Sequence, residues 1–401
     1  MGACCTWSAD PAPAPAVPGV YVHLPFCRSL CPYCDFTIAL RDPRAYRPLT
    51  QALLREWAAR APAAPPPTVY LGGGTPTELP SELLGELLGE LTAGGAAREV
   101  TVEANPESAT AGKLAALRAA GATRLSLGVQ SSVPRVLAVL GRNHGVSAAR
   151  AAFVAAREAG FASVNVDLIF GVPGQTLAEW ESTLDEVLGW GPDHLSAYAL
   201  ELDARVPLAR AIAAGRLAAC PEAEVEAQYA ALCRRAGRAG LEHYEISNFC
   251  RPGHASRHNQ GYWSRAPYVG LGPGAHSFDG ARRSWNVRPH RRYVERIAAG
   301  ESAAEGEERL TQSQHLLERV FLELRTAAGL ELGSLPTAVR EAAAGWAARQ
   351  DPRHVALEGD RLRFSEAGFW YSHGLTAELA ALLPADRDGG PRRPAPWRTH
   401  S

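Results

Sequence analysis

Three cysteines near the amino end have a spacing that could support chemistry. Cys27, Cys31 and Cys34 lie directly after an apolar, strand-like run. Three thiolates folded round a loop can bind three irons of a four-iron cubane, whereas a fully ligated cluster needs four cysteines. One iron would then stay open for an outside ligand. The alternative is that all three are buried and act as small hydrophobic residues.

The spacing C-x3-C-x2-C does not suit a structural zinc site, which needs four ligands, usually in matched pairs. No second pair follows, since Cys220, Cys233 and Cys250 stand singly. The arrangement resembles the signature of the radical S-adenosylmethionine (SAM) superfamily. This resemblance implies a [4Fe–4S] cluster whose open iron is chelated by SAM. It also implies that an electron from the cluster cleaves the sulfonium to a 5′-deoxyadenosyl radical.

A glycine-rich turn, Gly72-Gly73-Gly74-Thr75-Pro76, follows the second predicted strand. Consecutive glycines let the backbone adopt positive φ and approach a ligand closely. A tight strand-to-helix turn would use the same residues, so the motif alone is only moderately specific. The radical SAM resemblance implies that this segment contacts the amino-acid end of SAM.

Polar side chains also stand at or near the ends of later strands. Glu103, Gln130 and Asp167 are at carboxyl ends, and Arg142 follows the helix after Gln130. Carboxylates suit ribose hydroxyls or an ammonium group, and arginine suits a carboxylate. Taken singly, each is more typical of a structural polar residue. Together, on consecutive repeats that face one cavity, they favour ligand binding.

The elements that must position these residues are predicted to alternate between β-strand and α-helix. Strands are predicted over 20–26, 68–71, 99–104, 124–129, 163–170 and 194–202, with helices over 44–60, 81–92, 110–120, up to about 159, 176–189 and 221–239. Six repeats in one direction indicate a parallel sheet with helices outside. Carboxylates late in such strands favour a barrel-like sheet, whose functional groups gather at the strands' carboxyl ends. We therefore expect an α/β fold with a partial (β/α)6 barrel.

The regular alternation of strand and helix ends after Leu241. The pattern predicts a strand over 243–249, helices over 306–326, 334–348 and 366–382, and a hairpin over 355–364. The last part resembles a small winged-helix-like module. The expected organisation is a disordered leader (1–18), a core barrel (19–250), a connector (251–300), a C-terminal helical domain (301–384) and a disordered tail (385–401).

Composition excludes several functions. The 41 basic and 42 acidic side chains balance, so no charge field indicates nucleic acid as a partner. Lys113 is the only lysine, which excludes a phosphate loop of the G-x4-G-K-[ST] type and essentially excludes a Schiff-base lysine. No apolar run reaches about 18 residues, so no transmembrane segment is expected. The amino end lacks the features of a secretory signal, which leads us to expect a cytoplasmic protein.

A closer resemblance covers about residues 20–380. The segments that carry it, in order, are Tyr-x-His-x-Pro-Phe-Cys-x3-Cys-x2-Cys-Asp-Phe, Gly-Gly-Gly-Thr-Pro, Glu-Ala-Asn-Pro, Leu-Gly-Val-Gln-Ser, Leu-Gly-Arg-x-His, Asp-Leu-Ile-x-Gly-x-Pro and Tyr-Glu-Ile-Ser-Asn-Phe. They resemble the oxygen-independent coproporphyrinogen III oxidase group. The resemblance implies that Cys27, Cys31 and Cys34 bind the cluster. It implies that the SAM site is lined by Tyr21, Tyr33, Gly73, Gly74, Thr75, Glu103, Gln130, Arg142 and Asp167.

That group contains true oxidases and HemW-type heme chaperones, and three features favour the chaperones. True oxidases place a further cysteine two residues after the third cluster ligand, where this chain has Phe36. They also carry a long N-terminal extension, whereas here the first strand begins within 20 residues. Third, the segment His258-Asn259-Gln260-Gly261-Tyr262-Trp263 resembles the H-N-x-x-Y-W signature of the chaperones.

This signature could bind heme. Heme iron takes His, Cys, Met or Tyr ligands, and Met1 is the only methionine. His258 would supply an imidazole, with Asn259, Tyr262 and Trp263 beside the macrocycle. Judged by residue type alone, the two aromatic residues are more typical of core packing. Cys250, His254 and His276 are weaker alternative ligands.

The leading hypothesis is a heme-binding radical SAM protein that transfers heme to acceptor hemoproteins, including respiratory ones near the membrane. An electron donor for the cluster would be a further partner. The second hypothesis is a true oxidase that decarboxylates coproporphyrinogen III to protoporphyrinogen IX. The third is a heme-binding module with a vestigial SAM site. The sequence leaves open whether the protein is an enzyme.

Overall fold

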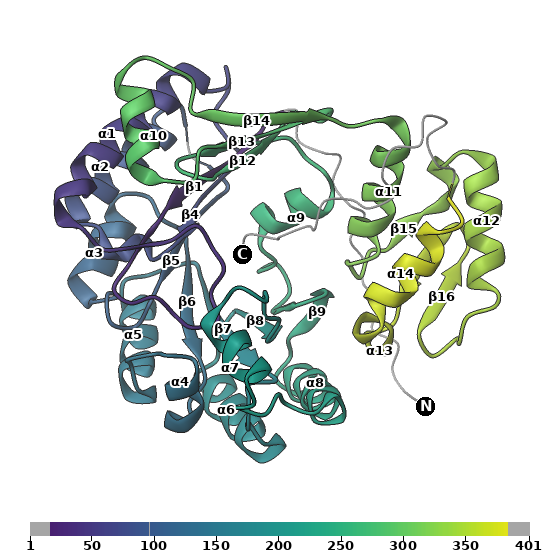
Figure 1. Cartoon of the computed structure of the whole chain (residues 1–401). Helices are drawn as coiled ribbons and strands as arrows, with labels where there is room; N and C mark the ends of the chain where they lie inside the picture. The colour runs from purple at the N-terminus through teal and green to yellow at the C-terminus, as the bar shows by residue number, and fades with distance from the viewer. Residues whose placement is uncertain (1–16, 96, 384–401) are drawn as a thin grey trace.

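The computed structural model describes residues 17–95 and 97–383. The expected disordered leader and tail lie almost wholly outside these ranges. One mixed sheet of twelve strands dominates the described chain, and most of the helices that connect its strands cover its outer face (Figure 1). The predicted α/β fold is confirmed.

Six parallel strands form the centre of the sheet in the order β1-β4-β5-β6-β7-β8. Their bounds are β1 Gly19–Leu24, β4 Thr68–Gly73, β5 Glu99–Ala104, β6 Arg124–Gln130, β7 Ser163–Phe170 and β8 His194–Ala199. Each predicted strand is present, with ends shifted by at most three residues. These strands are largely apolar and most of their side chains are buried, and several of the polar residues within them line the cavity described below.

The connecting helices appear where the sequence predicts them, except for the short helix α7, which was not predicted. They are α1 Pro43–Arg60, α2 Ser81–Thr92, α3 Ala111–Ala119, α4 Pro134–Val139, α5 Val146–Glu158, α6 Leu177–Gly189, α7 Pro207–Ala213 and α8 Glu222–Arg238, with a 3-10 turn η1 at Pro76–Glu78. A capping box between Thr176 and Glu179 starts α6. Among the described residues, no helix is both long enough and apolar enough to cross a bilayer.

Later segments extend the sheet on both sides. Next to β1 lies β11 (Tyr268–Leu271), which is parallel to it, followed by antiparallel β12 (His276–Phe278), β13 (Arg282–Asn286) and β14 (Ala304–Arg309). Next to β8 lie β10 (Asn248–Cys250) and β9 (Glu242–Glu245). Within the described chain no strand pairing joins β14 to β9, so the sheet is open there. The single strand expected over 243–249 is therefore wrong, because a turn divides it into two paired strands.

Two short helices complete this part, α9 (Arg257–Trp263) and α10 (His290–Ala298). A buried carboxylate, Glu56 of α1, ties the extension to the barrel. It accepts hydrogen bonds from the Tyr293 hydroxyl (2.6 Å), the Asn286 amide (2.8 Å) and the Gly272 backbone N–H (2.9 Å). A small parallel pair, β2 (Phe26–Cys27) and β3 (Ala39–Leu40), brackets the cysteine loop.

The C-terminal module contains α11 (Gln312–Glu323), β15 (Leu330–Glu331), the 3-10 turn η2 (Leu332–Ser334), α12 (Thr337–Ala347), β16 (Val355–Glu358), β17 (Arg361–Phe364), α13 (Glu366–Trp370) and α14 (Ser372–Ala380). The predicted hairpin is β16–β17, and β15 completes a three-stranded sheet. The helix expected over 366–382 breaks at Tyr371 into α13 and α14.

The helix expected over 306–326 is wrong at its amino end. Residues 304–309 form edge strand β14, whose glutamates pair with arginines of β13: Arg282 with Glu307 (3.1 Å) and Arg283 with Glu308 (2.8 Å). The helix begins after Thr311, which forms a capping box with Gln314. That box is a local start signal, and it outweighs the weak helical pattern that precedes it.

Candidate functional site

The concave face of the sheet borders a cavity of about 1450 Å³. It is lined by the carboxyl ends of the parallel strands, the cysteine loop, α9 and the C-terminal module. All but two of the predicted site residues line it, namely Cys27, Cys31, Tyr33, Cys34, Gly73, Gly74, Thr75, Glu103, Gln130, Arg142, Asp167, Asn259, Tyr262 and Trp263. The two exceptions are Tyr21 and His258, which are buried behind the wall.

The three cysteines lie in the loop that follows β1, and all three thiols are partly exposed to the cavity. A turn brings the last two together, because the Cys34 N–H donates to the Cys31 carbonyl (3.1 Å). Burial raises the pKa of Cys27 to about 12 and also raises the pKa of Cys34. The Cys27 and Cys34 thiols are therefore protonated at neutral pH, and metal binding, which needs thiolates, would release their protons.

Two side chains from other repeats reach these sulfurs. The Thr75 hydroxyl donates to Cys27 Sγ (3.8 Å), and Arg142 donates to Cys31 Sγ (3.7 Å). Three thiols on one loop, with outside donors directed at two of the sulfurs, fit a cluster bound through three of its irons. In such a site the donors would stabilise the anionic sulfurs.

The glycine-rich turn at the end of β4 is packed against the cysteine loop. The Gly74 N–H donates to the Leu24 carbonyl (2.8 Å), and the Thr75 N–H donates to the Phe26 carbonyl (2.9 Å). Gly73 has φ +107°, and a Cβ there would lie 2.5 Å from the ring of His23. A Cβ on Gly74 would lie 2.7 Å from the Phe26 carbonyl oxygen. The glycines are therefore needed for the close approach of the two segments.

Glu103 stands at the end of β5 and faces the cavity. Its carboxylate accepts hydrogen bonds from the Tyr70 hydroxyl (2.7 Å) and the Gly73 N–H (3.2 Å). Burial outweighs these bonds and raises the pKa of Glu103 to about 7. Tyr21 lies behind Tyr70, with ring centroids 6.1 Å apart, so it supports this wall from behind.

Arg142 is held by oxygen acceptors from two strands. It donates to Asn105 Oδ1 and to the Gly128 carbonyl (3.1 Å), while Asn105 Nδ2 donates to the Thr75 hydroxyl (2.8 Å). Gln130 has the positive φ of 66° at a bulge between β6 and β7. A non-glycine residue in that region is strained, and such strain is found preferentially at functional sites. This chain of contacts places Arg142 beside the thiols.

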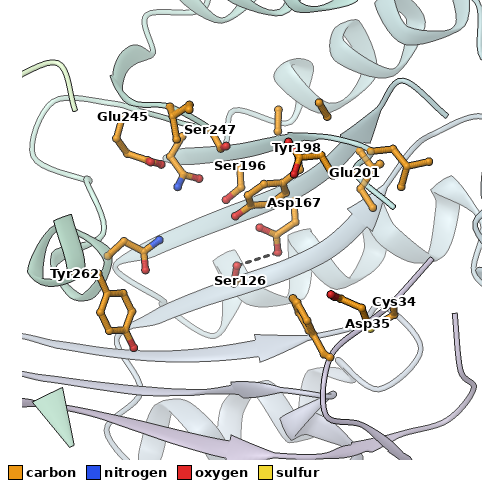
Figure 2. Close-up of a pocket in the computed structure, with 18 of the residues that line it drawn as sticks. Cys34, Asp35, Ser126, Asp167, Ser196, Tyr198, Glu201, Glu245, Ser247 and Tyr262 are labelled. Carbon is orange, nitrogen blue, oxygen red and sulfur yellow. Dashed lines mark hydrogen bonds between the residues drawn. The ribbon is translucent and has the colours of Figure 1, made fainter. Parts of the chain in front are cut away.

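Asp167 lies in β7 at the centre of a polar network, which Figure 2 shows together with Ser126, Ser196 and Tyr198. Its carboxylate accepts from the Ser126 hydroxyl (2.9 Å) and from Asn165 Nδ2 (2.7 Å). Burial raises the pKa of Asp167, although these hydrogen bonds oppose the shift. The serine and asparagine fix the carboxylate so that it can accept a ligand hydroxyl or face a cation.

The segment His258 to Trp263 lies in α9, which begins one residue earlier at Arg257. Its amino end is held by Glu99, which accepts from the backbone N–H groups of Arg257 (2.8 Å) and His258 (3.1 Å). His258 is buried, with Nδ1 at 2.9 Å from the Thr68 hydroxyl and Nε2 at 2.9 Å from the Tyr262 hydroxyl. Burial lowers its pKa to about 3. In this conformation both ring nitrogens are engaged, so the imidazole has no nitrogen free for a metal.

Several cavity residues were not predicted. Asn105 and Glu245 lie within motifs that carry the family resemblance, so that signal could have found them. Ser126, Asn165 and Ser196 form the network around Asp167, and their only local signal is a polar residue in an apolar strand. Residues of the C-terminal module, including Phe321, Arg325 and His373, also line the cavity, and no sequence signal connected them to it.

Comparisons with known proteins agree with this geometry. The family model described as the radical SAM superfamily matches residues 21–187. The chain is 41% identical over 344 residues to the heme chaperone HemW of Mycobacterium tuberculosis, covering 83% of this chain and 88% of that protein. It is 35% identical over 317 residues to the heme chaperone HemW of Bacillus subtilis, covering 77% and 84% respectively.

Among solved structures, coproporphyrinogen III oxidase (HemN) of Escherichia coli superposes with a TM-score of 0.79 over 90% of each chain, at 23% sequence identity. A likeness at this identity establishes the fold alone. The superfamily itself implies a [4Fe–4S] cluster and SAM, which the three thiols and the polar strand ends described above fit. The chain therefore belongs to the HemW family within the radical SAM superfamily.

Proposed function

We propose that this protein is a heme chaperone, which binds heme and transfers it to acceptor hemoproteins with a [4Fe–4S] cluster and SAM as resident cofactors. The relatives it resembles at 41% and 35% identity carry that name. One observation in the structure carries the proposal: the same cavity is lined by the three thiols and by apolar residues of the C-terminal module. One compartment can therefore hold SAM and a larger, apolar second ligand.

The residues in the inner part of the cavity have distinct roles in this proposal. Cys27, Cys31 and Cys34 hold the cluster, and Arg142 stabilises the charge on the sulfurs. Glu103 and Asp167 accept hydrogen bonds from SAM. When bound, the cluster and SAM supply one-electron reductive cleavage of the sulfonium, for which an external electron donor is needed. The described cysteines are all free thiols, which suits a reducing compartment such as the cytoplasm.

The direct test measures two activities of anaerobically reconstituted protein in parallel. One assay follows stoichiometric heme binding and then transfer to an apo-hemoprotein, by absorbance. The other follows decarboxylation of coproporphyrinogen III in the presence of SAM and a reductant. We expect heme binding and transfer without decarboxylation. The oxidase alternative would be upheld by decarboxylation at useful turnover, and absence of heme binding would refute the chaperone proposal.

A further inference from the structure

The cavity has an outer half that the SAM site does not use. It is formed by α8, α11, α13 and α14, and its apolar lining includes Tyr229, Leu317, Phe321, Trp370 and Ala377. The total of about 1450 Å³ exceeds the roughly 300–1,000 Å³ typical of a pocket for one small ligand. Helices α11 and α14 pack together on the side of the module that faces α9 (Figure 1). This half can therefore accommodate a large apolar ligand beside the inner site.

An iron-bearing ligand in this half would have one imidazole available. Of the described histidines, His373 on α14 is the only one that lines the cavity. His258 lies outside the lining with both ring nitrogens bonded. The ring of His373 is exposed, and no hydrogen bond from the described residues engages its nitrogens. It contacts Phe321 edge to face, with ring centroids 6.3 Å apart and an interplanar angle of 88°.

A positively charged side chain also packs on the Phe321 ring. The Arg325 guanidinium lies over Phe321, 3.8 Å from the ring centroid, and its NH1 donates to the Phe321 carbonyl (2.9 Å). Burial lowers the pKa of Arg325 to about 10, so the side chain stays charged at neutral pH. An arginine in an apolar wall is suited to a carboxylate of an otherwise apolar ligand. Heme combines these features: an apolar macrocycle, an iron that takes imidazole, and two anionic propionates.

We propose that heme occupies this outer half, with His373 as an axial ligand to its iron and Arg325 facing a propionate. The inference rests on the proposed chaperone function and names the residues that carry it out. It places the axial ligand to the heme iron in the C-terminal module rather than in α9. His258, Tyr262 and the Glu99 cap then act as the scaffold between the two halves, since His258 and Tyr262 are bonded to each other.

The test is a hemin titration of anaerobic, cluster-reconstituted protein, followed by Soret difference spectra. Wild-type protein should bind one heme with a shifted Soret band. His373→Ala should bind at least tenfold more weakly and lose the shift, and added imidazole should restore the band. The matched control is His354→Ala, since His354 lies in the same module but does not line the cavity. This control should behave as wild type.

A second pair of measurements tests the propionate contact. Arg325→Gln should lower hemin affinity about tenfold, because a charge-assisted hydrogen bond to a propionate is lost. The Soret band should not move, because His373 remains as the axial ligand to the iron. Its affinity for heme dimethyl ester, which has no carboxylates, should match that of wild type. If wild-type protein binds heme and His373→Ala gives the same spectrum and affinity, the ligand assignment fails while the chaperone function stands. If wild-type protein binds no heme, the function itself fails.

Discussion

At the scale of single residues, the site contains one partly buried carboxyl group, Glu103, and one fully buried carboxyl group, Glu245. The pKa of Glu103 is raised to about 7 and that of Glu245 to about 8, and in both cases burial is the main cause. A nearby positive charge favours the ionised form of such a group. The sulfonium and ammonium groups of SAM would therefore lower these pKa values, so that ligand binding and proton release are linked.

Glu103 gives a prediction for stability against pH. Its folded-state pKa of about 7 lies above the ordinary 4.5, so folding favours the protonated form. The resulting stabilisation is present below about pH 4.5 and is lost as the pH rises through 7. Glu103→Gln keeps an acceptor for Tyr70 and removes the ionisation. We expect the variant to be more stable than wild type at pH 8, by about 1–3 kcal/mol given the partial exposure of the carboxyl.

Thermal unfolding of the protein without cofactors, at several pH values from 5 to 8, measures this effect. The difference in Tm between variant and wild type should be small at pH 5 and grow toward pH 8. A difference that stays constant across this range would show that Glu103 does not ionise with a raised pKa.

At the scale of elements, the turn after β4 positions the cysteine loop through backbone contacts. Gly73 and Gly74 approach so closely that a Cβ at either position would overlap His23 or Phe26. The loop itself has little regular structure, with only the short β2–β3 pair. The geometry of the three thiols therefore depends on the neighbouring repeat as much as on the loop's own sequence.

Replacing Gly73 tests this dependence. Gly73→Ala should destabilise the fold by about 1–2 kcal/mol for its left-handed φ, with a further ~1–3 kcal/mol for overpacking against His23. The iron content after reconstitution should also fall, because the loop is displaced. Gly85→Ala in α2 is the matched control: a Cβ at Gly85 would have no other atom within 4 Å, so this change should stabilise the helix by about 0.5–1 kcal/mol. Equal iron content in both variants would argue against the positioning role.

At the scale of the whole molecule, the cavity is completed by two parts of the chain that are far apart in sequence. Two backbone hydrogen bonds attach the C-terminal module to the β9 region. The Ile246 N–H donates to the Arg325 carbonyl (2.9 Å), and the Ala327 N–H donates to the Tyr244 carbonyl (2.9 Å). In addition, the Tyr229 hydroxyl of α8 donates a hydrogen bond to the Glu366 backbone carbonyl (2.9 Å). Arg325 is thus positioned directly by the strand β9 region that borders the inner half.

Because the two halves use different residues, they should be separable by mutation. Cys31→Ser should lose most of its iron and its SAM binding, while hemin affinity stays within about threefold of wild type. Iron analysis, SAM calorimetry and hemin titration of the same preparation check the three quantities. Cys220→Ser, a cysteine outside the cavity lining, is the control and should keep all three. A parallel loss of heme binding in Cys31→Ser would instead place heme at the cluster.

Much of the central fold could be predicted, because a buried parallel sheet imposes a strong local pattern. The run from Ser163 to Phe170 alternates three polar residues with apolar ones before an apolar end, and its strand was predicted without error at either end. By contrast, β14 consists largely of charged residues and has no strand pattern of its own. It is a strand because it pairs antiparallel with β13, and the ion pairs between the two strands join residues about 25 positions apart in the sequence.

The sequence by itself determined the three thiols, the glycine turn and the polar strand ends, because each lies at a spacing that a local motif can specify. It could not determine that Tyr21 and His258 are buried behind the cavity wall, since cross-strand contacts with Tyr70 and Thr68 decide that. Nor could it show that His373 and Arg325 face the same cavity as Cys27. That juxtaposition depends on how the C-terminal module packs on the barrel, which only the tertiary structure decides.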